Sequence, residues 1–298
     1  MRDFSQDHRW LSINTATVRA QWPLDRIVDE CARREIRAIS PWRDQVAALG
    51  IERLAKQLRE TGIALSGYCR GGMFPAADVA GRQAALDDNR RAVDEARLLD
   101  SACLVMVVGG LPGALAGVPV HKDIAAARSE VRDSLAATLE YARHVGMPLA
   151  IEPLHPMYAA DRACINTLEQ ALDLCDALDP QGQRALGVEG SQRTALGVAV
   201  DVYHVWWDPK LQAQITRAGA KRLLALHVCD WRLPTRDLLN DRGMMGDGVI
   251  DIPRIRGWME AGGYAGYSEV EIFSALDWWQ RPGEEVLETC IARHRSAV

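Results

Sequence analysis

The chain has 298 residues, of which 48% are hydrophobic and 25% charged, and its formal net charge at pH 7 is −5. This composition is typical of a globular protein with ample material for a core. The negative charge argues against a nucleic-acid partner, which usually requires a basic face. No apolar run approaches the roughly 20 residues of a membrane span, so we expect a cytoplasmic protein with no membrane partner.

Short β-like runs alternate along the chain with longer segments of helical periodicity, which is typical of βα units around a parallel sheet. We predict strands at Leu11–Asn14, Ala38–Ser40, Ala64–Gly67, Cys103–Val108, Leu149–Glu152, Val198–Asp201, Leu223–Val228 and Ser268–Ile272. Helices are predicted at Leu24–Arg34, Gly50–Thr61, Asp87–Leu99, Ile124–Val145, Thr167–Leu178, Pro209–Ala218, Ile252–Ala261 and Glu284–Arg293. Eight strands close a barrel, so we predict a single (β/α)8 TIM barrel domain over residues 1–298, with Asp179–Thr194 as an inserted loop.

Four polar residues close the last four of the predicted strands: Glu152, Asp201, His227 and Glu271. Each of them alone is more simply explained as a helix cap or a surface residue. All four at successive strand ends converge on one rim of a parallel barrel, which favours a metal site. Three carboxylates and one imidazole suit Mn²⁺, Mg²⁺ or Co²⁺ better than structural zinc; manganese is the first choice, with zinc possible as well.

Four further residues are candidates for binding substrate. His155 and His204 each lie three positions beyond a predicted metal ligand, and either is suited to contact a substrate hydroxyl or to orient a ligand; loop packing is the alternative. Arg70 and Arg242 lie in glycine-bearing loops on the same face. Their planar guanidinium groups suit a polyol, a carboxylate or a phosphate. The alternative is an ion pair that stiffens the loop.

The segments that begin at these residues carry a resemblance. They read Glu152-Pro-Leu-His-Pro156, Asp201-Val-Tyr-His204 and His227-Val-Cys-Asp-Trp231, together with the Arg242–Asp251 and Glu269–Ser274 stretches. They resemble the xylose isomerase-like TIM barrel family of sugar phosphate isomerases and epimerases, over Leu11 to about Trp279. The resemblance implies that Glu152, Asp201, His227 and Glu271 bind one divalent cation, and that Glu152 and Glu271 transfer a proton at a carbon beside a carbonyl.

The resemblance predicts an enzyme that acts on a small sugar or polyol, and it leaves the reaction open. The leading hypothesis is a divalent-metal-dependent isomerase or epimerase of a ketose, a keto-polyol or a related sugar derivative, acting through an enediolate. The alternative is a lyase, either an inosose-type dehydratase or an eliminase of a keto-glycoside. The seven histidines and the negative charge disfavour a DNA-repair endonuclease. A non-enzymatic sugar-binding barrel and a homo-oligomer also stay open.

Overall fold

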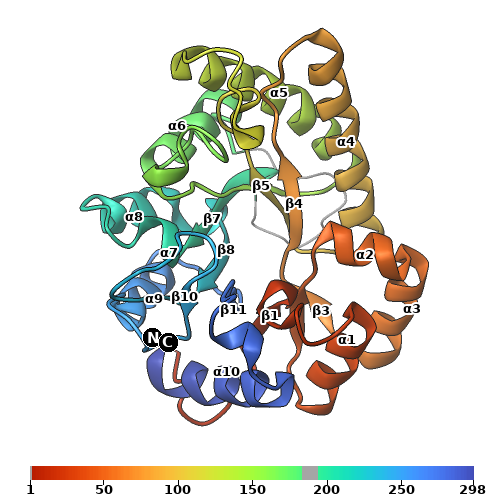
Figure 1. Ribbon diagram of the computed structural model, residues 1–298, viewed down its shortest axis with the longest axis vertical. Coiled ribbons are helices and arrows are strands. Elements are labelled where there is room, and N and C mark those ends of the chain that lie inside the picture. The colour runs from red at the N-terminus through yellow and green to blue at the C-terminus, as the bar shows by residue number, and fades with distance from the viewer. Residues whose placement is uncertain (1, 183–193) are drawn as a thin grey trace.

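A nearly closed barrel of parallel strands forms the centre of the molecule, and its helices lie outside it (Figure 1). The computed structural model describes residues 2–182 and 194–298. In this part of the chain, nine strands share one sheet, in the order β3-β2-β1-β11-β8-β7-β6-β5-β4. They are β1 (Leu11–Asn14), β2 (Ala38–Ser40), β3 (Ala64–Leu65), β4 (Tyr68–Gly72), β5 (Leu104–Val107), β6 (Leu149–Ile151), β7 (Leu196–Asp201), β8 (Leu223–Val228) and β11 (Ser268–Val270). The predicted single α/β TIM barrel is confirmed.

The third position of the barrel is occupied by two short strands in place of one. We predicted a strand at Ala64–Gly67, whereas β3 ends at Leu65 and β4 begins at Tyr68 after two intervening residues. β3 pairs with β2 and β4 pairs with β5, and a parallel bridge joins Trp42 to Cys69. The two strands are the ends of the sheet, and this single bridge nearly closes the ring. The polar, glycine-rich sequence of β4 lacks the apolar signal on which our strand predictions relied.

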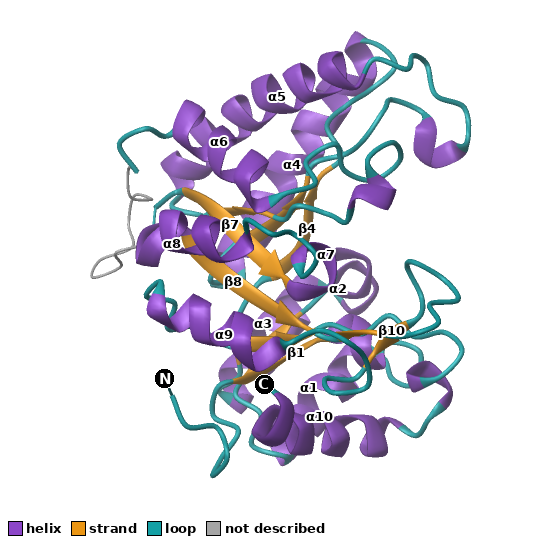
Figure 2. Ribbon diagram, turned by 90° about the vertical axis from the view of Figure 1, so that its left-hand side faces the viewer, coloured by secondary structure: helices purple, strands orange, loops and turns teal. Residues whose placement is uncertain are grey.

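The helices surround the sheet, as Figure 2 shows from a second side. They are α1 (Leu24–Arg33), α2 (Arg43–Leu49), α3 (Ile51–Thr61), α4 (Val79–Leu98), α5 (Ile124–Val145), α6 (Leu168–Leu178), α7 (Val202–Val205), α8 (Leu211–Arg222), α9 (Ile252–Ala261) and α10 (Gly283–Ala297). None of the described helices is both long enough and apolar enough to cross a membrane.

The predicted helices differ from the structure in several places: α8 and α10 each end four residues later than predicted, and the short α7 was not predicted. The two larger differences concern α4 and α2. α4 begins at Val79, not at Asp87, because the Asp78 side chain caps it by accepting from the Gly81 amide at 2.7 Å. Its first two turns bury no apolar residue and so give no periodic signal. α2 was not predicted; Gly50, at φ 94°, separates it from α3. Most of the predicted loop Asp179–Thr194, residues 183–193, lies outside the described residues.

Strict alternation along the strands places a polar layer above a layer of small residues inside the barrel. Side chains two positions apart in a strand point to the same face. Ala150, Ala199 and Ala225 belong to a buried interior cluster. Asp201 and His227 each follow two residues after one of these alanines, and they pair in register across β7 and β8. The small side chains below thus leave room at the carboxyl ends of the strands for larger polar groups.

Candidate metal centre

The four predicted metal ligands form one buried cluster at the carboxyl ends of neighbouring strands. Asp201 ends β7 and His227 lies near the end of β8, while Glu152 and Glu271 directly follow β6 and β11. Each of them is at most 5% exposed. One oxygen or nitrogen of each residue lies within 4.8 Å of those of the others. The prediction that the four residues converge is correct.

Two of the four residues, His227 and Glu152, lie side by side without a well-formed hydrogen bond between them. His227 Nδ1 lies 2.8 Å from Glu152 Oε1 and 3.7 Å from Glu271 Oε2. Within the described residues, neither His227 nitrogen nor Glu152 Oε1 has a hydrogen-bond partner of acceptable geometry. Buried polar atoms without partners are costly. Donors that turn toward a common centre are what a coordinated cation requires, so the residues fit a divalent metal site.

The charges of the cluster support the same fit. Burial opposes a charge on His227, but the surrounding glutamates outweigh it and raise the pKa of His227 well above its usual range. Burial also raises the pKa of Glu271 to about 8, against the opposing positive charges of Arg242 and His227. Glu271 therefore holds a proton at neutral pH when no metal is bound. A divalent cation would displace this proton and stabilise the carboxylate.

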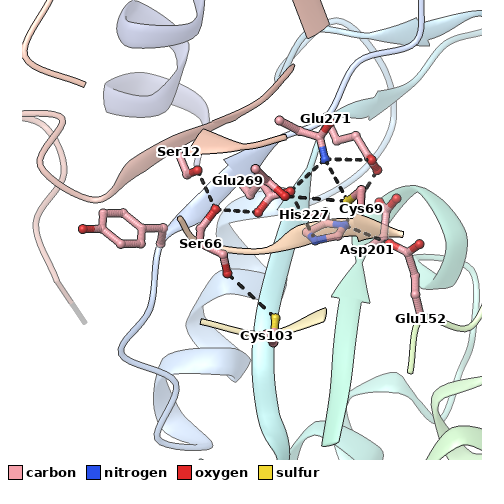
Figure 3. A network of polar contacts seen from close by, with 12 residues as sticks. Ser12, Ser66, Cys69, Cys103, Glu152, Asp201, His227, Glu269 and Glu271 are labelled. Carbon is pink, nitrogen blue, oxygen red and sulfur yellow. Dashed lines mark hydrogen bonds and ion pairs between the residues drawn. The ribbon is translucent and has the colours of Figure 1, made fainter. Parts of the chain in front are cut away.

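A fourth carboxylate, Glu269, lies beside the cluster, between Ser66 and His227 (Figure 3). Its Oε1 lies 3.5 Å from His227 Nε2 and accepts a hydrogen bond from Asn14 Nδ2 at 2.9 Å. Its Oε2 accepts from the Ser66 hydroxyl at 2.7 Å. Asn14 also donates to Glu271 Oε1 at 3.0 Å. This network holds Glu271 from the side of the barrel interior and places Glu269 within ion-pair distance of His227.

Arg242 reaches the cluster from a short antiparallel ribbon, β9 (Asp230–Trp231) paired with β10 (Arg242–Gly243). Its Nη1 donates to Asp201 Oδ2 at 2.8 Å and to Glu271 Oε2 at 3.1 Å. Burial opposes the charge on Asp201, but Arg242 and the neighbouring histidines outweigh it and lower the pKa of Asp201. The predicted alternative of a loop ion pair is therefore only half right, because the partners of Arg242 are two of the candidate metal ligands.

His204 is held beside Arg242 in one tautomer. Arg242 Nη2 lies 3.1 Å from His204 Nε2, and a guanidinium can only donate, so Nε2 accepts and the proton lies on Nδ1. His204 Nδ1 has no partner among the described residues. Burial, helped by the charge of Arg242, lowers the pKa of His204 to about 3. The side chain is therefore a neutral donor with its N–H unused.

A cavity opens above the cluster, and three of the four predicted substrate-binding residues line it: Arg70, His204 and Arg242. Of the metal candidates, only Glu152 and Glu271 line this cavity, whereas Asp201 and His227 do not. The rest of its wall is mainly apolar and aromatic, with Trp42, Cys69, Met73, Val105, Val107, Leu154, Tyr158, Arg162, Leu239 and Phe273.

His155 is the predicted substrate-binding residue that does not line this cavity. Its ring stacks on Trp231 at 5.0 Å between centroids and meets Trp207 edge-on at 5.9 Å. Its Nδ1 accepts from the Met157 amide at 3.3 Å and so caps the 3-10 turn Pro156–Tyr158. The structure gives His155 a role in packing the loop, and contact with substrate stays a prediction.

The fold and the cluster together define a parallel α/β barrel with a buried carboxylate and imidazole centre at the carboxyl ends of its strands. The chain belongs to the xylose isomerase-like TIM barrel family, whose family model matches residues 28–292. No curated protein matches the chain significantly.

The chain is similar over most of its length to solved structures that include the following three. A protein from Sinorhizobium meliloti is 55% identical, with a TM-score of 0.89 and coverage of 97% of this chain and 98% of that one. The IolI protein, in a structure with a bound zinc atom, is 17% identical, with a TM-score of 0.74 and 94% coverage of both chains. The 3-keto-D-glucoside 4-epimerase YcjR of Escherichia coli is 17% identical, with a TM-score of 0.69 and coverage of 94% and 97%.

Sequence reasoning missed several residues that the structure brings to the site. Asn14 and Glu269 are fully or almost fully buried beside the candidate ligands. Two signals were available for them. Asn14 ends the first predicted strand, in the same way as the metal ligands end theirs. Glu269 lies two residues before Glu271 in one strand, so the side chains of Glu269 and Glu271 point to the same face, into the barrel. Tyr158 and Arg162 come from the irregular loop after β6, where no periodic pattern indicates direction.

Proposed function

We propose that the protein is a divalent-metal-dependent isomerase or epimerase that acts on a ketose, a keto-polyol or a related sugar derivative. Manganese is the proposed metal, with magnesium, cobalt and zinc as alternatives. The cytoplasmic location and the absence of a nucleic-acid partner remain predictions from the sequence. The similarity to a 3-keto-D-glucoside 4-epimerase supports a keto-sugar substrate, although at 17% identity it establishes only the fold.

The proposal rests on a difference in position among the four candidate ligands. Glu152 and Glu271 follow the outer two of the four neighbouring strands, and only these two ligands reach the cavity. Asp201 and His227 lie between them and deeper. A bound substrate would therefore meet one carboxylate on each side. Two carboxylates in this relation can remove a proton from carbon and return it to the same or a neighbouring carbon.

The remaining polar groups of the cavity suit the recognition of a carbonyl and its neighbouring hydroxyl. A divalent cation held by the four ligands would polarise these oxygens and so acidify the adjacent C–H bond. His204 lines the cavity and keeps an N–H without a partner among the described residues, since its other nitrogen accepts from Arg242. Arg242 holds both His204 and the carboxylate of Glu271 in position.

Exchange of hydrogen with solvent tests the proposal. We expect the purified protein with Mn²⁺ to incorporate deuterium from D₂O at a carbon next to the carbonyl of at least one sugar in a panel of ketoses and keto-polyols. Glu152→Gln and Glu271→Gln should each abolish this incorporation, whereas Glu169→Gln, on the surface beside Lys210, should not. No incorporation across the panel would refute the proposal.

Product mass separates the two reactions that begin with the same proton removal. An isomerase or epimerase leaves the mass of the sugar unchanged apart from deuterium. A dehydratase or eliminase loses water or an aglycone. Loss of mass would leave the proton-abstracting role of Glu152 and Glu271 in place and would assign the protein to the lyases.

A further inference from the structure

Two arginines in the cavity wall have no described partner for their charge. Arg70 belongs to β4 and Arg162 to the loop after the turn Pro156–Tyr158, and both line the cavity above Glu152 and Glu271. Within residues 2–182 and 194–298, neither guanidinium makes a hydrogen bond or an ion pair. The Arg162 guanidinium lies 5.9 Å from the centroid of the Tyr158 ring. The adjacent Asp161 forms no ion pair with it.

A third arginine on this side of the cavity, Arg43, does have partners for its charge. Arg43, which also faces Arg70, pairs with Asp88 and with Glu95, each at 2.8 Å. Asp88 and Glu95 are therefore already paired with Arg43 and are not free for Arg70. Burial, followed by the positive charge of Arg162, lowers the pKa of Arg70, and the neighbouring Cys69 and Glu152 oppose this shift without outweighing it.

A guanidinium stays charged at all physiological pH values, so Arg70 and Arg162 keep their charges in the cavity wall. Both residues are half-buried, and a charge that is partly removed from water without a partner is unfavourable. The second guanidinium nearby makes the arrangement worse. An anion between Arg70 and Arg162 would relieve both costs.

An uncharged donor stands in the same wall. Tyr158 is 6% exposed and lines the cavity, yet its hydroxyl has no hydrogen-bond partner among the described residues. Burial raises the pKa of Tyr158 to about 12, so the hydroxyl keeps its proton and is able to donate. Two guanidiniums and one hydroxyl without partners are a set of donors that matches the oxygens of one carboxylate or phosphate group.

The glycine-rich loop Gly243–Gly248 does not compete for this role. Phosphate groups are often bound by backbone amides in the loops after the last strands of such barrels. Here the amides of Gly246, Gly248 and Ile250 all donate to the buried side chain of Asp230, at 2.9–3.0 Å. These amides are therefore occupied by the protein itself.

We propose that Arg70 and Arg162, with the Tyr158 hydroxyl, form an anion subsite, and that the substrate is an acidic sugar derivative whose carboxylate or phosphate binds there while its keto end faces Glu152 and Glu271. This inference rests on the proposed function for the position of the keto end. The anion subsite itself depends only on the three side chains in the cavity wall.

Matched sets of ligands test the subsite by binding alone. Isothermal titration of the Mn²⁺-loaded protein compares each of several ketohexoses with its 6-carboxylate and its 6-phosphate, for example D-fructose, D-fructuronate and D-fructose 6-phosphate. We expect at least one acid or phosphate to bind about 10- to 100-fold more tightly than its neutral partner, as charge-assisted hydrogen bonds to two arginines imply. The tighter of the two series identifies the anion.

Two variants and a control assign the preference to these residues. Arg70→Gln and Arg162→Gln should each remove most of the preference for the anion, whereas Arg91→Gln, which removes the same charge from an exposed pair with Asp88, should keep it. Circular dichroism checks that each variant is folded. The inference is overturned if no acid or phosphate binds more tightly than its neutral partner, or if the preference survives in both pocket variants.

The binding experiment and the deuterium-exchange experiment can give opposite outcomes, and each outcome then rejects a different proposal. An arginine-dependent preference without deuterium incorporation would keep the anion subsite and reject the isomerase. Deuterium incorporation with a neutral ketose, and no preference for its acid, would keep the isomerase and reject the subsite.

Discussion

Arg242 donates from Nη1 to Asp201 Oδ2 at 2.8 Å, and both side chains are almost completely buried, at 3% and 0% exposure. The guanidinium is also covered by the rings of Tyr203 and Phe273, at 4.5 and 5.3 Å. The pair joins a strand of the barrel to the ribbon above it. The positive charge of Arg242 therefore both fixes the ribbon of β9 and β10 to the barrel and offsets the negative charge of the candidate metal ligands.

Loss of Arg242 should therefore destabilise the metal-free protein. Removing one partner of a buried ion pair leaves an uncompensated charge and costs about 3–5 kcal/mol. We expect Arg242→Gln to lower the free energy of unfolding by about that amount in EDTA, as measured by urea denaturation. Arg242→Lys keeps the charge and should lose less. Equal stability of the wild type and Arg242→Gln in EDTA would show that the pair contributes nothing.

The candidate metal ligands predict a stabilisation by divalent cations. A cation that binds only the folded state stabilises it by mass action. We expect Mn²⁺ to raise the melting temperature of the wild type, and Asp201→Asn to remove most of this increase. The amide oxygen of asparagine can still accept from the Tyr203 amide, which Asp201 now caps at 2.8 Å, so the fold should persist.

Differential scanning fluorimetry with and without Mn²⁺ measures this effect. Asp44→Asn, which removes an exposed carboxylate paired with Arg19, is the matched control and should keep the full shift. An unchanged melting temperature of the wild type at millimolar Mn²⁺, Mg²⁺, Co²⁺ and Zn²⁺ would contradict the metal site.

The sequence predicted the centre of the site better than its surroundings. The four ligands end strands in which an apolar run gives a strong signal, and the parallel order of those strands brings their ends together. Arg242 was predicted to face the site, but its partners were not. They depend on the ribbon of β9 and β10, two residues per strand, which is too short for any periodic pattern.

The same limit applies to the cavity wall. Arg162 and Tyr158 lie on an irregular segment whose direction is set by tertiary packing. Arg70 lies in β4, whose polar and small residues give no clear strand pattern. His155 shows the converse. Its position three residues after Glu152 predicted a side chain in the site, whereas stacking on Trp231 directs the ring into the loop.

Glu269 should tune metal affinity although it is not among the four ligands. Its carboxylate lies 3.5 Å from His227 Nε2, within ion-pair distance, and we expect it to help orient the ring when a metal is bound. Partners that orient a ligating histidine are typically worth about 10–100-fold in metal affinity. We expect Glu269→Gln to weaken Mn²⁺ binding by about that factor, as measured by isothermal titration. Ser66→Ala, which removes the donor to Glu269 Oε2, should act in the same direction but more weakly.

A change in turnover alone would not test this role, so the metal affinity is the measurement that decides. Glu260→Gln provides the control, because Glu260 pairs with Arg2 far from the barrel mouth. If Glu269→Gln binds Mn²⁺ as tightly as the wild type while remaining folded, then Glu269 serves only the packing of the barrel interior.

Because His294 is buried, we expect the protein to lose stability in mild acid. It lies on α10, is fully buried, and stacks on Phe4 with 4.5 Å between ring centroids. Burial, with the positive charges of His8 and Arg256, lowers the pKa of His294 to about 3. An unfolded histidine has a pKa of about 6.5. As the pH falls below that value the unfolded chain binds the proton first, so the folded state loses stability progressively until the pH reaches the folded pKa.

The expected loss from His294 between pH 7.5 and pH 5 is roughly 2 kcal/mol, because each unit of pKa difference corresponds to about 1.4 kcal/mol. Urea denaturation at the two pH values measures it. His294→Leu should reduce the difference between the two pH values by about that amount, whatever its effect at pH 7.5 alone. His144→Leu, at an exposed position of α5, should leave the difference as in the wild type. A pH dependence that is the same in the wild type and His294→Leu would mean that His294 gains its proton in the folded state as readily as in the unfolded chain.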